Sequence, residues 1–96
     1  MAPEVFLRKV GANLKRARWL AGLTQQQVQG ITLRYYQDLE RGLRNPTLEI
    51  LLLLAQQFGV SVADLVNVPG ARAAETRLED RPAQPPPRGR KPRKPR

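Results

Sequence analysis

The chain has 96 residues and carries 17 Lys or Arg against 8 Asp or Glu, for a formal net charge of +9. It contains neither Cys nor His, which excludes disulfides and thiolate metal sites and removes the commonest general base and metal ligand. A chain of this length supports one small domain, and its charge indicates a polyanionic partner, most often nucleic acid.

Helix-capping residues divide the first two thirds of the chain. Thr24 begins a capping box with Gln27 three positions later, and Ser61 with Asp64 forms a near relative of that motif. Further N-cap candidates are Thr32 and Thr47, and the glycines placed where helices end are Gly22, Gly30, Gly42 and Gly59. Together these signals predict five helices, over about residues 4–21, 25–29, 33–41, 48–58 and 62–66.

The apolar spacing predicts that these helices share one core, since no stretch alternates like a strand. The first helix contributes Val10, Leu14 and Ala17, and the fourth contributes Leu48, Leu51, Leu52, Ala55 and Phe58. The other expected core residues are Leu23, Val28, Ile31, Tyr36, Leu39, Val60 and Leu65. We therefore expect an all-α domain over residues 1–66.

The helix expected over 48–58 carries more apolar surface than one packed face needs. Ile50 and Leu53 lie one turn apart on it. Two interpretations stay open: core residues that overflow in a small domain, or an interface with a second copy or another protein.

The composition changes after residue 66, and the last 30 residues hold nine Lys or Arg against three acids. The composition predicts a partly helical linker over residues 67–81 and a disordered Pro/Arg/Lys-rich tail over residues 82–96. The segment "PRGRKP", residues 87–92, resembles an AT-hook, a basic motif that enters the minor groove of A·T-rich DNA. The expected DNA-binding residues of the tail are Arg88, Gly89, Arg90, Lys91, Arg93 and Lys94. Non-specific attraction to phosphates is the alternative.

An ordered set of segments between residues 10 and 65 resembles the lambda-repressor/Cro type (xenobiotic-response-element type) of helix-turn-helix transcriptional regulator. The segments are "VGANLKRAR", "AGLTQ", "LERG" and "RNPTLEILLLLAQQFGVSVADL". The resemblance implies a five-helix lambda-repressor-like DNA-binding domain whose third helix enters the major groove. It also implies that Gln25 contacts a phosphate and that Arg18 and Glu40 serve the structure. The positions that it turns toward DNA are Leu33, Arg34, Tyr35, Gln37 and Asp38.

The second helix departs from the family pattern, because it is about three residues short and Gly30 follows early. Three residues correspond to about 300° of helical rotation and about 4.5 Å. The faces on either side of the deletion then differ by only about 60°, so we expect the fold to survive. The placement of the following helix against DNA is the part that the deletion affects.

Arg34 and Gln37 lie on one face of the expected recognition helix, beside Leu33 and Asp38. Arg pairs with guanine and Gln with adenine in the major groove, and the alternative is that both side chains are only solvated. Asp38 would repel phosphates unless it accepts from a cytosine or pairs locally. Candidate phosphate contacts are Gln25, Tyr35, Arg41, Arg44 and Asn45.

These observations favour a sequence-specific DNA-binding transcriptional regulator, and the expected partners are double-stranded DNA, a second copy of the chain and a regulatory protein. We expect no enzymatic activity, cofactor or metal, and a cytoplasmic, nucleoid-associated protein of bacterial or phage type, since signal-peptide and membrane-spanning patterns are absent. The first alternative is a protein-interaction module of antitoxin or anti-repressor type on the same scaffold. The second is an architectural DNA binder that acts through the tail.

Overall fold

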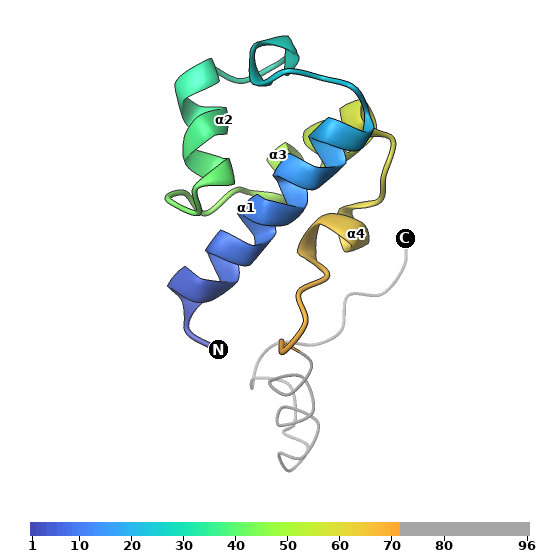
Figure 1. Ribbon diagram of the computed structural model, residues 1–96. Helices are drawn as coiled ribbons and strands as arrows, with labels where there is room; N and C mark the ends of the chain where they lie inside the picture. Colours follow the sequence, from blue (N-terminus) through green and yellow to red (C-terminus); the bar gives the residue numbers. More distant parts are fainter. Residues whose placement is uncertain (72–96) are drawn as a thin grey trace, which may run out of the picture.

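The computed structural model describes residues 1–71, and the tail residues proposed above lie outside this range. Its elements are α1 (Pro3–Leu20), the 3₁₀ turn η1 (Gln25–Gln27), α2 (Leu33–Glu40), α3 (Leu48–Phe58) and α4 (Val62–Val66). In Figure 1, the long α1 crosses the domain and packs between α2 and α4. No strand occurs within residues 1–71, so the prediction of an all-α domain is confirmed.

The predicted caps set the helix boundaries. The hydroxyls of Thr32 and Thr47 each accept a hydrogen bond at 3.1 Å, from the N–H groups of Tyr35 and Ile50. Ser61 and Asp64, expected as a near relative of a capping box, form the full reciprocal pair of hydrogen bonds, at 3.0 and 3.1 Å. Each bond satisfies an N–H group that the first helical turn leaves free. These caps mark the starts of α2, α3 and α4, and the four α-helices of the described residues begin and end within one residue of the predicted positions.

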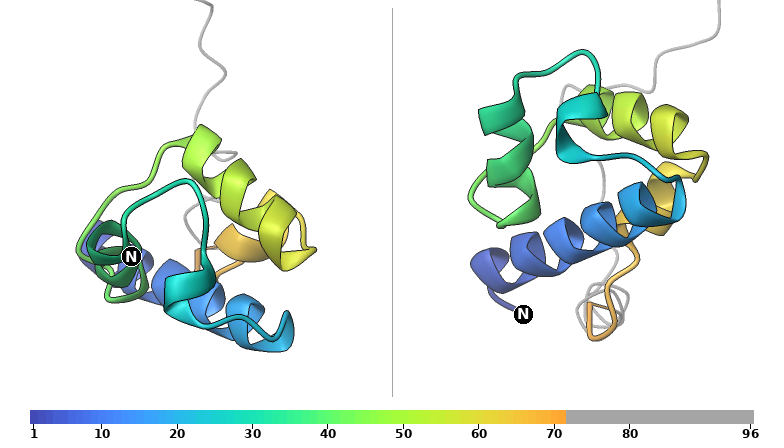
Figure 2. Two further views of the ribbon diagram at one scale, coloured as in Figure 1. Left: turned by 90° about the horizontal axis from the view of Figure 1, so that it is seen from above. Right: turned by 45° about the horizontal axis from the view of Figure 1, so that its top comes forward.

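The segment expected as a helix over 25–29 is a single 3₁₀ turn over Gln25–Gln27. The chain becomes extended at Val28 (φ −70°, ψ 126°), whose side chain is buried in the core. Gly30 then takes a left-handed conformation with φ +88°. The early glycine and the buried valine leave no room for a further helical turn, so the connection to α2 runs as an open loop beside α3 (Figure 2).

The core forms where all helices meet, and its fully buried side chains are Leu14, Tyr36, Leu39, Leu54 and Leu65. The prediction that Leu48 and Leu52 belong to the core is wrong, because their exposed fractions are 76% and 50%. The face of α3 that packs inward is instead the i, i+3, i+4, i+7 series of Leu51, Leu54, Ala55 and Phe58, which leaves positions 48 and 52 on its flank. The packing also continues beyond residue 66, because Val68 is buried.

Two residues of α1, Gly11 and Asn13, position the neighbouring helices. A Cβ atom on Gly11 would lie 2.4 Å from the carbonyl oxygen of Glu40, so this glycine allows α2 to touch the backbone of α1. Asn13 donates from its Nδ2 to the carbonyl oxygens of Leu65 and Asn67, each at 3.0 Å. α1 is therefore the element against which both α2 and the end of α4 are positioned.

Candidate nucleic-acid interface

A buried ion pair fixes the C-terminal end of α2 to α1. Arg18 Nε donates to Glu40 Oε2 at 2.8 Å and Arg18 Nη2 to Glu40 Oε1 at 3.3 Å, with both side chains less than 10% exposed. Arg18 Nη1 also donates to the carbonyl oxygen of Leu23 at 2.9 Å, and the Tyr36 hydroxyl donates to Glu40. These contacts give Arg18 and Glu40 the structural role that the family resemblance implied.

The pKa values of this cluster favour its charged ion pair. Burial raises the pKa of Glu40, but hydrogen bonds from Arg18, Tyr36 and Gln25 outweigh it and hold that pKa below its usual range. The hydrogen bond to Glu40 raises the pKa of Arg18. Burial, together with the bond to Glu40, raises the pKa of the Tyr36 hydroxyl well above its usual value. The carboxylate is therefore ionised and the phenol neutral near pH 7.

Gln25 and Gln37 continue this network from the buried pair to the surface. Gln25 Nε2 donates to Glu40 Oε1 at 2.9 Å, and Gln37 Nε2 donates to Gln25 Oε1 at 3.2 Å. Gln25 was expected at a phosphate and Gln37 at a base edge. The structure brings these two half-buried amides together and connects η1 directly to α2.

A small open hollow lies beside the two glutamines and is lined by Lys15, Gln25, Gln37, Glu40 and Arg41. Lys15 was missed in the sequence analysis, although it stands one turn before Arg18 on α1. Its Nζ lies 4.9 Å from the centre of the exposed Trp19 ring. Since Arg18 neutralises Glu40, Lys15 and Arg41 make the rim of this hollow positive.

Arg34 projects from the first turn of α2 and is 82% exposed, next to the 41% exposed Leu33. Asp38 is buried and lies 3.6 Å from Arg34 Nε and 3.5 Å from Arg44 Nε. The sequence left a base contact and local pairing open for Asp38, and the structure shows the local pairing. Arg44 in turn lies over the half-buried Tyr35 ring, 5.5 Å from its centre.

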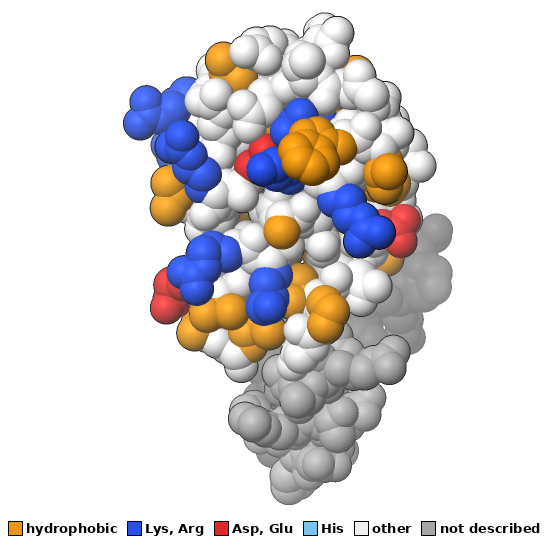
Figure 3. Space-filling model, viewed as in Figure 1, with side chains coloured by type: hydrophobic (Ala, Val, Ile, Leu, Met, Phe, Trp, Pro, Cys, Tyr) orange, Lys and Arg blue, Asp and Glu red, His pale blue; other side chains and the backbone are white. Residues whose placement is uncertain are grey.

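Arg41, Arg44 and Asn45 follow α2 and are exposed, as phosphate contacts must be. Figure 3 shows Lys and Arg side chains over the outer edge of α2 and more of them across the face of α1. On the face shown there, exposed basic side chains therefore lie on both α2 and α1.

The interface residues expected on α3 are largely covered. Ile50 packs against the core, and the Leu53 side chain lies over Gly30. The exposed apolar side chains of α3 are instead Leu48 and Leu52, which stand one turn apart.

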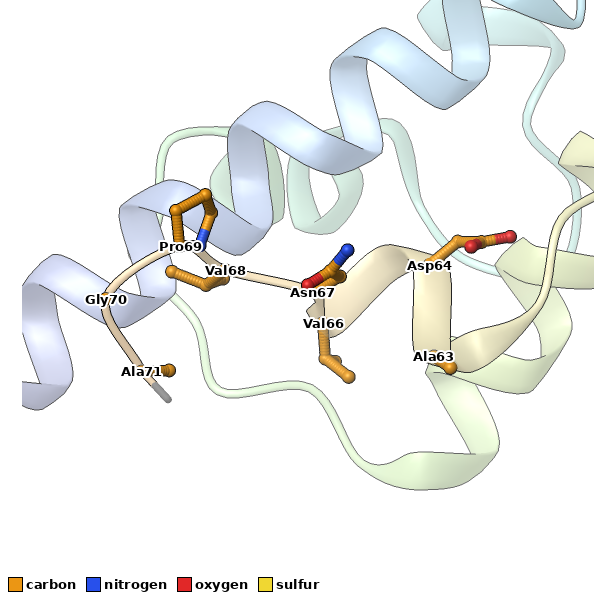
Figure 4. A pocket seen from close by; sticks show the side chains of 8 residues that line it. All are labelled: Ala63, Asp64, Val66, Asn67, Val68, Pro69, Gly70 and Ala71. Atoms are coloured by element: carbon orange, nitrogen blue, oxygen red, sulfur yellow. The ribbon is translucent and has the colours of Figure 1, made fainter. Parts of the chain in front are cut away.

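A second hollow lies where the described chain ends, between α4 and residues 67–71 (Figure 4). Among the described residues that line it, Asp64 is the charged one, and the others are apolar residues, Gly70 and Asn67. Within residues 1–71 there is no cluster of acidic side chains able to hold a metal ion, and no helix long and apolar enough to cross a membrane.

A helix-turn-helix family model matches residues 14–65, more than half of the chain. The chain is 48% identical over 61 residues to y4dJ of Sinorhizobium fredii, an uncharacterised HTH-type transcriptional regulator, covering 60% of this chain and 79% of that protein. It is 39% identical over 62 residues to the HTH-type transcriptional regulator DdrOP3 of Deinococcus deserti, covering 62% of this chain and 48% of that protein. No solved structure matches the chain.

Proposed function

The chain belongs to the Cro/C1-type helix-turn-helix family, and we propose that it is a transcriptional regulator that reads the sequence of duplex DNA with α2. The observation that carries the proposal is the outward face of α2. Arg34 is 82% exposed there at the first turn of the helix, while the opposite face is buried and anchored by Glu40. The first turn of a recognition helix is the part that reaches base edges.

Arg34 and Gln37 are the proposed base-reading residues. A guanidinium can pair with the O6 and N7 of guanine, and a glutamine amide with the N6 and N7 of adenine. Arg34 Nε lies 3.6 Å from Asp38 Oδ1, and this weak contact leaves the guanidinium exposed and free to reach a base edge. Leu33 adds an exposed apolar side chain that can contact a thymine methyl group.

The residues proposed for phosphates surround α2. Lys15, Gln25 and Arg41 share one hollow beside it, and Arg44 and Asn45 follow its end. Contacts of this kind fix the orientation of a protein on the duplex but read no sequence. In the proposed complex they hold α2 so that Arg34 meets the same base pair each time.

A second copy of the chain is the proposed partner on DNA, because family members commonly read two half-sites about one helical turn, or about 34–36 Å, apart. Exposed Leu48 and Leu52 on α3 support an apolar contact between copies more directly than the covered Ile50 and Leu53. The tail over residues 82–96 is proposed to add electrostatic affinity, with "PRGRKP" as an AT-hook-like element.

In-vitro selection of duplex DNA with the full chain, at near-physiological salt, tests this function. We expect an enriched motif, and we expect Arg34→Ala to lose preference at one or two of its positions, by about 1–3 kcal/mol each. Arg41→Ala should weaken binding to all sequences alike. Arg16→Ala, which removes an exposed charge from α1, is the control for net charge.

Selection with residues 82–96 deleted separates the two DNA-binding parts. Unchanged enrichment with weaker affinity at every sequence assigns specificity to the domain and electrostatic attraction to the tail. If the folded full chain enriches no motif, the proposed base reading is wrong. A protein-interaction module, the alternative on this scaffold, would then be tested with Leu52→Asp, which places a charge on the exposed apolar face of α3.

A further inference from the structure

The open connection between η1 and α2 is attached to α3 by a pair of side-chain hydrogen bonds. Gln57 Oε1 accepts from the N–H of Gln29 at 2.8 Å, and Gln57 Nε2 donates to the carbonyl oxygen of Gln29 at 2.9 Å. One amide therefore satisfies both backbone groups of a residue that lies outside any helix. The two residues are 28 positions apart in the chain.

The next residue of the connection is also held by α3. Leu53, one helical turn before Gln57, covers Gly30, and a Cβ atom at Gly30 would lie 2.8 Å from Leu53 Cδ2. We call the two hydrogen bonds between the Gln57 amide and the Gln29 backbone the clamp. The contact of Leu53 and the clamp thus act on consecutive residues, Gly30 and Gln29. They come from two positions on the same face of α3, since residues four apart are neighbours on a helix.

We propose that Leu53 and Gln57 form a splint, defined as these two side chains, that sets the position of α2 relative to η1 and thereby supports sequence discrimination. Gln57 is a positioning residue, since it acts on DNA through Gln29 and the helix that follows. The proposal rests on the proposed function, because it assigns a device to the same DNA-reading surface.

The short η1 explains why such a device is useful. Three residues of 3₁₀ turn do not form a rigid helix that could orient α2 by itself. A connection that moves freely must be ordered when α2 docks on a specific site, and that ordering reduces specific affinity. Loose binding to phosphates does not require the same precision. Loss of the splint should therefore weaken specific binding more than non-specific binding.

The clamp can be removed without disturbing the core, because its hydrogen bonds with Gln29 lie at the surface. Gln57→Met keeps the length of the side chain but removes its donor and acceptor. Gln56→Met makes the same chemical change at the adjacent exposed position of α3 and is the matched control. Both variants are made in the full chain.

The first experiment measures the affinity of each variant for the selected DNA site and for an unrelated duplex at one salt concentration. We expect Gln57→Met to lower the ratio of the two affinities about tenfold, equivalent to about 1.4 kcal/mol, with binding to the unrelated duplex unchanged. Gln56→Met should keep the wild-type ratio. An unchanged ratio for Gln57→Met, or an equal loss on both duplexes, would overturn the proposal.

Amide hydrogen exchange of Gln29 tests the splint without DNA. The Gln29 N–H should be protected in the wild type and in Gln56→Met, and should lose that protection in Gln57→Met at an unchanged free energy of global unfolding. Equal exchange in all three proteins overturns the splint even if the chain reads DNA. If the wild type discriminates no sequence while Gln29 is protected, the proposed function and the role in discrimination both fail, and the clamp itself stands.

Discussion

Replacing Arg18 by Met should strongly destabilise the domain, because it leaves the Glu40 carboxylate buried without its ionic partner. The Glu40 side chain is 6% exposed, and Arg18 supplies two of its hydrogen bonds, at 2.8 and 3.3 Å. Removing one member of a buried pair costs about 3–5 kcal/mol. A small domain whose total stability is about 5–15 kcal/mol would lose a large part of it, and its Tm would fall by on the order of 20 °C.

Urea and thermal unfolding followed by circular dichroism measure this loss. Arg16→Met is the control, since it makes the same substitution at an exposed position of α1 and should change the free energy of unfolding by less than about 0.5 kcal/mol. Adding Glu40→Gln to Arg18→Met should restore part of the stability, because an amide is less costly to bury than a carboxylate. A loss below about 1 kcal/mol, or a double variant no more stable than Arg18→Met, would refute this reasoning.

Three further predictions follow from single contacts. Asp38→Asn removes the carboxylate between Arg34 and Arg44, so affinity for unrelated duplexes should rise, in fluorescence anisotropy titrations, with a stability change below about 1 kcal/mol. Gly11→Ala would place a Cβ atom 2.4 Å from a backbone oxygen, so chemical denaturation should show a loss of roughly 3 kcal/mol instead of the gain of about 1 kcal/mol usual for this change in a helix. The lowered pKa of Glu40 stabilises the fold above the pKa of this carboxyl in the unfolded chain, about 4.3, and the stabilisation is lost as pH falls further. Glu40→Gln should therefore flatten the dependence of unfolding free energy on pH between about 5 and 3. An unchanged slope would contradict this prediction.

The ends of the helices could be predicted from the sequence, whereas the face that each helix buries could not always be predicted. Thr47 and Gly59 bound α3 by capping chemistry that depends only on nearby residues, so its limits could be read directly. The rotation of α3 about its axis depends on which neighbours it meets. Leu52 and Leu54 are equally apolar, yet one is 50% exposed and the other fully buried. Apolar spacing in a leucine-rich helix leaves two adjacent faces nearly equivalent, and tertiary packing selects one.

In the candidate site, too, features set by nearby residues could be predicted, and contacts between residues far apart in the chain could not. The outward position of Arg34 on α2 was predicted from helical spacing and a family resemblance, and its exposure agrees with it. The pairing of Gln57 with Gln29 joins residues 28 apart, and that of Asn13 with Leu65 joins residues 52 apart. No local pattern marks such contacts, because a surface glutamine or asparagine has the same sequence signature whether or not it clamps a backbone.

The short η1 changes which contacts orient the proposed DNA-reading surface. In a longer helix-turn-helix the second helix is itself rigid, whereas here η1 has three residues. The packing of α2 on α1 does not depend on the length of η1, since the ion pair with Arg18 and the close approach at Gly11 both involve the C-terminal end of α2. In the proposed splint, the connection that Gln57 binds limits rotation of α2 at its other end, and Gln25 joins η1 to α2 by hydrogen bonds. We expect substitution of Gln57 to alter sequence preference before it unfolds the domain, whereas loss of Arg18 at the other end of α2 destabilises the domain itself.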